Sequence, residues 1–309
     1  MPQLSTNFSF LVFPFSFPFA VSVRGILGLC LVLVLLLWGG EAQAGQLADR
    51  LAQFPGWESK PPVRVAEGDL VYPDWMEGTW QVTSTLVEQV APLAPDVVTP
   101  GFESNRRYLN QPISFQVRFQ AVNPQSSGIS GSTSAIPWAL RFVPLKTQSG
   151  YRDTALTKIK SPVVVADRAF NGLNIAKAYL SDRAIQSVKV DPDSPNRQIT
   201  SLRTGRQLIS IVTGRVSETP SPERFIATEV TKQVFRGIPQ PYFNEVETTT
   251  AYQLVKSSSL AIEADQVTAI YLSPQDADYF KALERPVALY RYQLKLLPVE
   301  SMVISSPAG

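Results

Sequence analysis

The amino-acid sequence predicts an all-β protein, and three observations lead to this prediction. Apolar and β-branched residues alternate with polar ones at period two in several segments, as in strands that bury one face. Proline is frequent, with 25 residues, and lies mostly between those segments. Short turns separate successive segments in the C-terminal half, which is typical of an antiparallel sandwich or barrel.

The composition is that of a globular chain, and it excludes several function classes. Of 309 residues, 44% are hydrophobic and 17% charged, and the net charge of +2 is spread without a basic stripe for nucleic acid. The chain has no histidine and a single cysteine, Cys30. These counts exclude Ser-His-Asp and Cys-His catalysis, the common zinc sites and His-ligated haem. We therefore predict no enzyme activity, no catalytic or metal-ligating residue and no cofactor.

Residues 1–44 have the three parts of a secretory signal. Arg24 precedes an apolar run from Ile26 to Trp38, and an Ala-x-Ala motif ends at Ala44. The apolar run is shorter than the ~20 residues that a membrane-spanning helix needs. We expect export and cleavage near Ala44, with a retained anchor as the alternative.

Residues 45–71 should form a helical and then extended N-terminal segment. Leu47, Leu51 and Phe54 give a short amphipathic helix, and Pro55-Gly56 ends it. We expect this helix to cap one mouth of a barrel; the alternative is a helix that binds a partner.

Residues 72–300 should form a single β domain, and residues 301–309 a flexible tail. After Gly78 the first strand places Trp80, Val82, Ser84 and Leu86 on one face. The next segment, residues 91–111, is long and proline-rich, and it carries adjacent charge and an aromatic in Arg106, Arg107 and Tyr108. Such a loop is typically a lid or a binding loop.

The second strand, residues 113–122, shows the clearest alternation. Phe115, Val117 and Phe119 share a face that must meet a core or a cavity. Shorter strands are expected at residues 138–142 and 163–165. Residues 168–180 are ambiguous, because Gly172 and two asparagines weaken a helical pattern.

From residue 184 the remaining strands follow one another, and one short helix interrupts them. They are expected at residues 184–190, 207–216, 223–235, 242–255, 260–272 and 287–297. In the fourth of these strands, Val246, Thr248, Thr250 and Tyr252 share one face. Pro274 at a first helical position and the acids after it predict a helix within residues 273–284.

The first and last strands carry a pattern that resembles the lipocalins. Gly78-x-Trp80 opens the first strand, and Arg291 lies on the last strand. The resemblance implies an up-and-down lipocalin-like (calycin) β-barrel, in which Arg291 packs on the Trp80 indole and closes one end.

Wider segments resemble an uncharacterised family of exported proteins from cyanobacteria and plastids. These segments are YPDWMEGTW, GFESNRRYLNQP, DRAFNGLNIAKAYL, DPDSPNRQITSLRTGRQL and NEVETTTAYQ. The resemblance implies a location in the periplasm or the thylakoid lumen, and it implies no activity.

The leading functional hypothesis is an exported barrel that binds or chaperones a small hydrophobic ligand, such as a pigment, lipid or quinone. Apolar faces of the strands would line the interior, and Arg106 and Arg107 would stand at the entrance for a polar or anionic head. The candidate ligand-binding residues are Trp80, Arg106, Arg107, Tyr108, Phe115, Val117, Phe119, Val246 and Tyr252. The alternative is a structural or assembly factor that contacts a photosynthetic membrane complex, with a barrel filled by its own side chains.

Charged residues elsewhere have both a functional and a structural interpretation. Glu245 and Glu247 share a strand face, which suggests either a carboxylate pair for acid–base chemistry or, as we prefer, a solvated outer face. Arg118, Arg203 and Arg206, like Arg106 and Arg107, could bind a carboxylate or phosphate, or could simply be surface or salt-bridge residues.

Overall fold

The computed structural model describes residues 45–123, 161–256 and 260–299. The predicted signal in residues 1–44, the predicted strand at 138–142 and the predicted tail at 301–309 lie outside these residues. Among the described residues, none of the helices has the length and apolar character that crossing a membrane requires.

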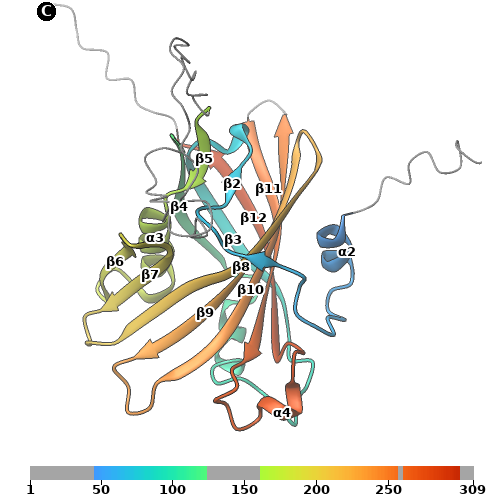
Figure 1. Cartoon of the computed structure of the whole chain (residues 1–309), viewed down its shortest axis with the longest axis vertical. Coiled ribbons are helices and arrows are strands. Elements are labelled where there is room, and N and C mark those ends of the chain that lie inside the picture. Colours follow the sequence, from blue (N-terminus) through green and yellow to red (C-terminus); the bar gives the residue numbers. More distant parts are fainter. Residues whose placement is uncertain (1–44, 124–160, 257–259, 300–309) are drawn as a thin grey trace, which may run out of the picture. The chain divides into compact units, whose positions relative to one another are not determined.

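The described residues form one antiparallel sheet of twelve strands, curled into a half-barrel (Figure 1). Seven strands that follow one another along the chain are also neighbours in the sheet. They are β6 (Ile185–Asp191), β7 (Ser194–Leu202), β8 (Gln207–Ser221), β9 (Arg224–Arg236), β10 (Tyr242–Lys256), β11 (Leu260–Leu272) and β12 (Ala288–Pro298). The predicted all-β, antiparallel barrel architecture is therefore confirmed.

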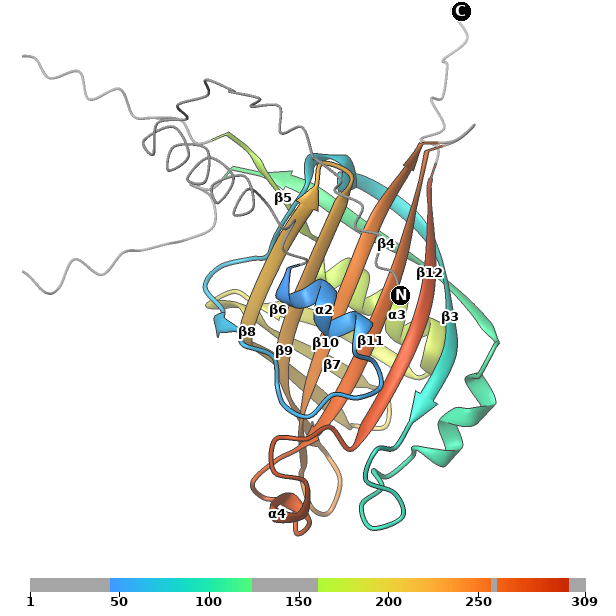
Figure 2. The same cartoon turned by 90° about the vertical axis from the view of Figure 1, so that its right-hand side faces the viewer.

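Four further strands extend the sheet beyond β12 (Figure 2). They are β3 (Gly78–Val90), β4 (Pro112–Val122), β5 (Val163–Ala166) and β2 (Val71–Tyr72). The first long strand thus pairs with the last one, β3 with β12, as in an up-and-down barrel. Within the described residues, the hydrogen-bonded path still has two ends, β2 and β6, so this part of the sheet does not close.

The segment 64–72 crosses between the two arms of the sheet at one end. Its first part, β1 (Arg64–Val65), pairs with β8, and its last part, β2, pairs with β5. Arg215 on β8 donates to the backbone oxygen of Gly68 over 2.7 Å. This segment, which we call the strap, therefore joins β8 to β5, two strands that share no ladder. The sequence predicted only an extended piece after Pro61-Pro62.

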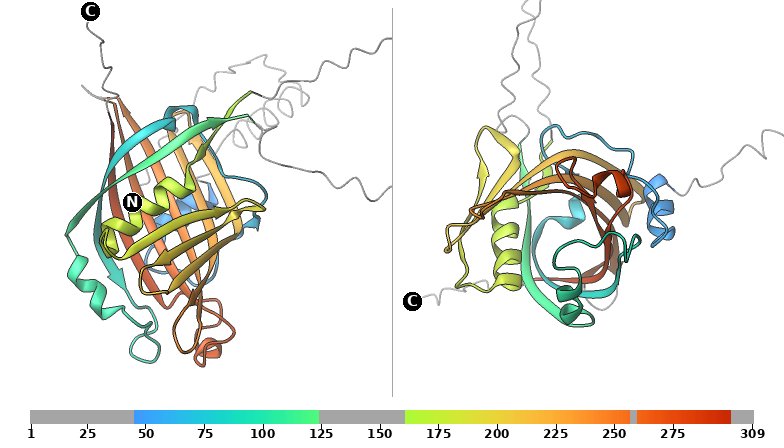
Figure 3. Two further views of the ribbon diagram at one scale, coloured as in Figure 1. Left: turned by 90° about the vertical axis from the view of Figure 1, so that its left-hand side faces the viewer. Right: turned by 90° about the horizontal axis from the view of Figure 1, so that it is seen from below.

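Helix α3 (Arg168–Leu180) lies along the concave side of the half-barrel and fills the opening between its arms (Figure 3). The Asp167 carboxylate caps its first turn by accepting from the Phe170 N–H over 3.0 Å. Gly172 allows a close approach, since an added Cβ would lie 2.5 Å from the Gln198 amide nitrogen. The ambiguous segment is thus helical, and its glycine serves contact with the β7 strand.

Helix α2 (Gln46–Ala52) lies on the convex side of the sheet, outside the barrel (Figures 2 and 3). Leu47 and Leu51 are buried there in a cluster with Ile226 on β9, Val267 on β11 and Leu289 on β12. The amphipathic helix was correctly predicted, but its predicted place at a barrel mouth is wrong.

The other short elements differ modestly from the predictions. The loop 91–111 contains a 3-10 helix, η2 (Glu103–Tyr108), and a further one, η1 (Asp74–Met76), precedes β3. The helix expected within residues 273–284 is only α4 (Tyr279–Ala282). Strand β7 was missed, because residues 191–205 are rich in turn-forming types yet pair with both β6 and β8.

Candidate functional site

A large, partly open cavity with mostly apolar lining surface lies between α3 and the inner faces of β7 to β10. Its volume is ≈ 1120 Å³, which is in the range of sites for drug-sized and larger ligands. Both Arg168 and Leu180, the two ends of α3, line it. At 1.5 Å rise per residue the cavity therefore runs for about 18 Å along the helix.

The two walls of this cavity differ in chemistry. One face of α3 contributes Ile175, Ala176, Tyr179 and Leu180, and the strand wall is largely hydroxyls and amides, such as Thr231 and Gln233. No residue of α3 is fully buried, and the side chains of Ile175 and Leu180 remain 39% and 52% exposed. A helix inside a fold usually buries its apolar face, whereas this one faces a space that the described residues do not fill.

Two smaller cavities adjoin the large one and bring in several of the predicted residues. One of ≈ 330 Å³ is lined by Phe115, Val117, Phe119 and Tyr252, and it shares Tyr179 with the large cavity. One of ≈ 160 Å³ is lined by Tyr108. Tyrosine is common to all three: the lining tyrosines are Tyr72, Tyr108, Tyr179, Tyr242, Tyr252 and Tyr292.

One end of the half-barrel interior is filled by side chains. Trp80 is only 2% exposed, and its indole N–H donates to the Met76 backbone oxygen over 2.8 Å. Next to it, the Tyr72 ring lies 4.8 Å from Phe119 and 5.6 Å from Phe225. Trp80 thus belongs to this filled end and lines none of the three cavities. Val246 faces the interior and is buried, but it borders none of the three cavities.

A charge network stands where the filled end meets the large cavity. Glu229 accepts from Arg168 over 2.7 Å and lies 3.0 Å from an Arg215 nitrogen. Asp69 of the strap lies 3.4 Å from Arg168. Burial acts to lower the pKa of Arg168, and Glu229 outweighs it, so the pKa is raised. Two arginines and two carboxylates balance here, so this end of the cavity carries no net charge.

Two arginines without such partners lie at the opposite end of the large cavity. Arg206 is in the β7–β8 turn and Arg236 ends β9; both line the cavity and both are exposed. Among the described residues, neither side chain has an ion pair or a hydrogen bond with protein atoms. This end we call the rim.

The arginines that the sequence suggested for the entrance are elsewhere. Arg106 is occupied by Glu103, one helical turn away, at 2.6 Å. Arg107 lies 4.7 Å above the Tyr108 ring. Neither lines any of the three cavities, so their entrance role stays a prediction that the cavity linings do not support. The loop that carries them does reach the large cavity, through Pro100, and Phe102 anchors it against Tyr290.

The predicted contact between Trp80 and Arg291 is also wrong. In the β3–β12 ladder, Trp80 lies opposite Pro298, whereas Arg291 lies opposite Glu88, eight positions along β3. Arg291 instead pairs with Asp265 over 2.7 Å and lies 5.3 Å from the Phe54 ring that follows α2. The sequence signal correctly identified strands that are neighbours, but not their register or the outward direction of Arg291.

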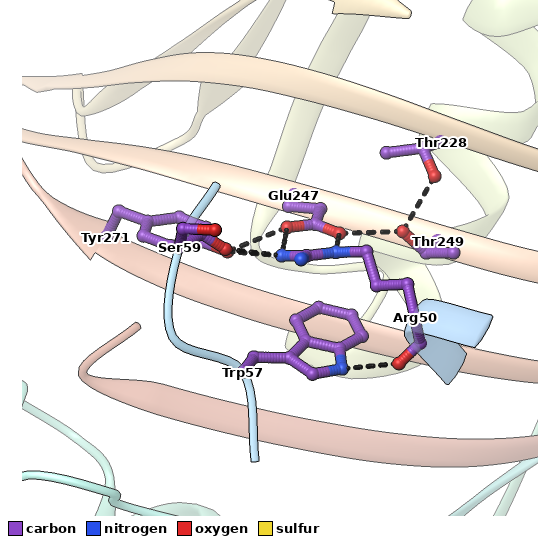
Figure 4. Close-up of polar contacts among 7 residues, drawn as sticks. All are labelled: Arg50, Trp57, Ser59, Thr228, Glu247, Thr249 and Tyr271. Atoms are coloured by element: carbon purple, nitrogen blue, oxygen red, sulfur yellow. Dashed lines mark hydrogen bonds and ion pairs between the residues drawn. The ribbon is translucent and has the colours of Figure 1, made fainter. Parts of the chain in front are cut away.

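On the convex side, Glu247 is wholly buried beneath the N-terminal segment (Figure 4). Arg50 of α2 donates to both carboxylate oxygens over 2.6 and 2.7 Å, and the Tyr271 hydroxyl donates over 2.7 Å. Thr249 donates to the same group over 2.8 Å. The expectation of a solvated face is wrong for Glu247. The pair does not act together either, because Glu245 is engaged by Lys60 at 3.2 Å.

The buried tyrosines predict a loss of stability at alkaline pH. Burial raises the pKa of Tyr252 to about 12, although its ring is partly open to the cavity, and burial also raises the pKa of Tyr72. Because the folded protein holds this proton more tightly than the unfolded chain, the raised pKa contributes to stability. This contribution is fully present below the ordinary pKa near 10 and is lost as pH rises toward about 12. Urea unfolding across this window should therefore show a steep decline that is smaller in Tyr252→Phe. Tyr279→Phe, in α4, is the control; equal declines in both variants would contradict the assignment.

No group of three or more Asp, Glu, His or Cys suited to a metal ion occurs in the described part of the chain. The sequence profile of one family, Domain of unknown function (DUF6816), matches residues 64–300, from the start of β1 to just beyond β12. No curated protein and no solved structure matches the chain.

Proposed function

We propose that this chain, which belongs to the family Domain of unknown function (DUF6816), is an exported protein that binds a small hydrophobic molecule inside its half-barrel. The ligand occupies the cavity between α3 and β7 to β10. Pigments, lipids and quinones are the classes that fit a long space with apolar and tyrosine walls. The protein binds or chaperones the molecule and does not transform it.

One observation carries the proposal: the inner face of α3 covers a cavity of ≈ 1120 Å³ without filling it. Exposed apolar surface costs about 25 cal/mol per Å², so half-exposed Ile175 and Leu180 are unfavourable unless something covers them. At the inner end of the cavity, which holds the charge network, the charges are already paired. A hydrophobic molecule that binds there would therefore not leave an unpaired charge without water.

We expect saturable binding of at least one apolar compound by the purified chain beginning at Gly45. Titration with Nile red, retinoids, quinones, carotenoids and fatty acids, followed by tryptophan and ligand fluorescence, measures it. Trp75 and Trp80 lie at the filled end, next to the cavity system, and report on occupancy. Absence of saturable binding for every class would refute the proposal.

Filling the cavity with a side chain tests the location. Ala176→Trp places an indole into the space from the inner face of α3 and should weaken binding by about tenfold or more, equivalent to ~1.4 kcal/mol. Lys177→Trp is the matched control, because Lys177 points to the outer side of the same helix, where it pairs with Asp182. Equal losses in both variants would place the ligand elsewhere.

A second function, a structural or assembly factor that contacts a membrane protein complex, is favoured by one surface feature. Phe280 and Leu283, in and just after α4, are 81% and 55% exposed. Exposed large apolar side chains are typical of contact surfaces. Purification from the native host distinguishes the two functions, since a co-purifying apolar molecule supports the first and a stoichiometric membrane complex supports the second.

A further inference from the structure

We infer that the cavity selects amphiphiles with a carboxylate head, and that Arg206 and Arg236 bind this head at the rim. The inference rests on the proposed function, and it assigns the ligand class and the residues that recognise it. The tail then extends inward along α3, toward Tyr72 and the charge network at the inner end.

The backbone holds the two arginines side by side. Gln207, the residue after Arg206, is the register partner of Arg236 in the β8–β9 ladder. Gly237, the residue after Arg236, has φ +78. A Cβ added to it would lie 2.7 Å from the Gly205 oxygen and 2.9 Å from the Arg206 Cα. The two turns therefore touch through glycine backbone, which fixes the separation of the arginine Cα atoms.

The charge distribution makes this rim the anion-attracting end. Deeper in the cavity, Arg168 is compensated by Glu229 and Asp69. Among the described residues that line the cavity, the unpaired charges are those of Arg206 and Arg236, and both are positive. An anionic head would thus be drawn to the rim, and its hydrocarbon tail would meet Leu180, Ile238 and Phe235 directly inside.

Guanidinium groups suit a carboxylate in this setting. Each presents parallel N–H donors that match the two carboxylate oxygens, and charge-assisted hydrogen bonds of this kind are stronger than neutral ones. Because both arginines are exposed, they keep their water until the head arrives and cost little when the site is empty. A neutral head would gain no such contact while its tail would bind equally well.

The test compares two amphiphiles of equal chain length, dodecanoate and dodecanol, as competitors of protein-bound Nile red. The measured quantity is the ratio of their dissociation constants, so that the different intrinsic hydrophobicity of the two compounds cancels between proteins. Replacing both rim residues, Arg206→Gln with Arg236→Gln, should shift this ratio by about tenfold against dodecanoate. Arg203→Gln, in the same β7–β8 turn but lining the outer groove beside α3, should shift it by less than about twofold.

Salt provides a second readout. The preference for dodecanoate in the wild-type protein should weaken as ionic strength rises, because the rim is exposed, whereas dodecanol binding should not. If both compounds bind and the double variant leaves their ratio unchanged, the carboxylate inference is overturned and the proposed function stands. If neither compound nor any other apolar ligand binds, the proposed function fails, and the inference fails with it.

Discussion

Replacing Trp80 with alanine should lower the free energy of unfolding by about 3–5 kcal/mol, the usual loss for a large core side chain. Trp80 is 2% exposed and occupies the centre of the filled end, among Val82, Val117 and Leu296. Its removal leaves a void that the strap and η1 cannot easily fill. It also leaves the Met76 backbone oxygen without the indole N–H that it accepts at 2.8 Å.

Urea or thermal unfolding of the Gly45 chain measures this loss, and Trp75→Ala is the matched control. Trp75 lies five residues earlier, is only half-buried, and donates its indole N–H to the exposed Pro222 oxygen over 3.0 Å. Its replacement should cost clearly less than that of Trp80. A similar loss for the two tryptophans would show that the filled end does not depend on Trp80.

The same substitution also separates the two halves of the interior. The large cavity lies along α3 and does not include Trp80 among its lining residues. At a temperature at which the Trp80→Ala protein is still folded, it should therefore bind the ligand as tightly as the wild type does. Ala176→Trp should bind it more weakly. This outcome would place stability at one end of the half-barrel and ligand binding at the other.

The strands could be predicted well because their signal is local. Alternation in β4 and β10 required only neighbouring residues, and strands β9, β11 and β12 have observed bounds within a residue or two of the expected ones. Strand β7 escaped prediction because its pairing partners, not its composition, make it a strand. Asp191, Pro192 and Asp193 form the tight β6–β7 turn, and the polar segment that follows is held by ladders on both sides.

The site could be predicted only in part, for a related reason. Periodicity identified Phe115, Val117, Phe119 and Tyr252 as inward-facing, and they do line a cavity. It could not show that one face of α3 lines a cavity, since an amphipathic pattern looks the same over a core and over an empty space. It also could not place Arg206 at a cavity, because only the tertiary fold brings the β7–β8 turn there. For Arg106 a local signal was present in the sequence, since its partner Glu103 lies three residues earlier.

The position of α2 depended on contacts that no sequence window contains. Arg50 and Glu247 are 197 residues apart, and their ion pair joins the helix to the convex face of the sheet. The preferred interpretation of Glu247 as solvated followed from its outward direction on β10. The Glu247 side chain does point outward, but the N-terminal segment covers it.

Replacing Arg50 with alanine should destabilise the protein by about 3–5 kcal/mol, because it leaves the Glu247 carboxylate buried without its counter-ion. The side chain of Glu247 is 0% exposed and that of Arg50 is 11% exposed. The Arg50 guanidinium also lies 4.0 Å from the Trp57 ring, a contact worth ~0.5–2 kcal/mol. Lys60→Ala is the control, because its ion pair with Glu245 is more exposed and should contribute only about 0–1 kcal/mol.

A double variant separates the cost of an unpaired charge from the cost of losing contact area. In Arg50→Met with Glu247→Leu no charge is left buried, so most of the stability lost in Arg50→Ala should return. Limited proteolysis within residues 45–63 reports on the same event locally, since α2 should detach in Arg50→Ala and remain docked in the double variant. If the double variant is as unstable as Arg50→Ala, the burial of Leu47, Leu51 and Trp57 would depend on the ion pair's geometry and not on charge neutralisation.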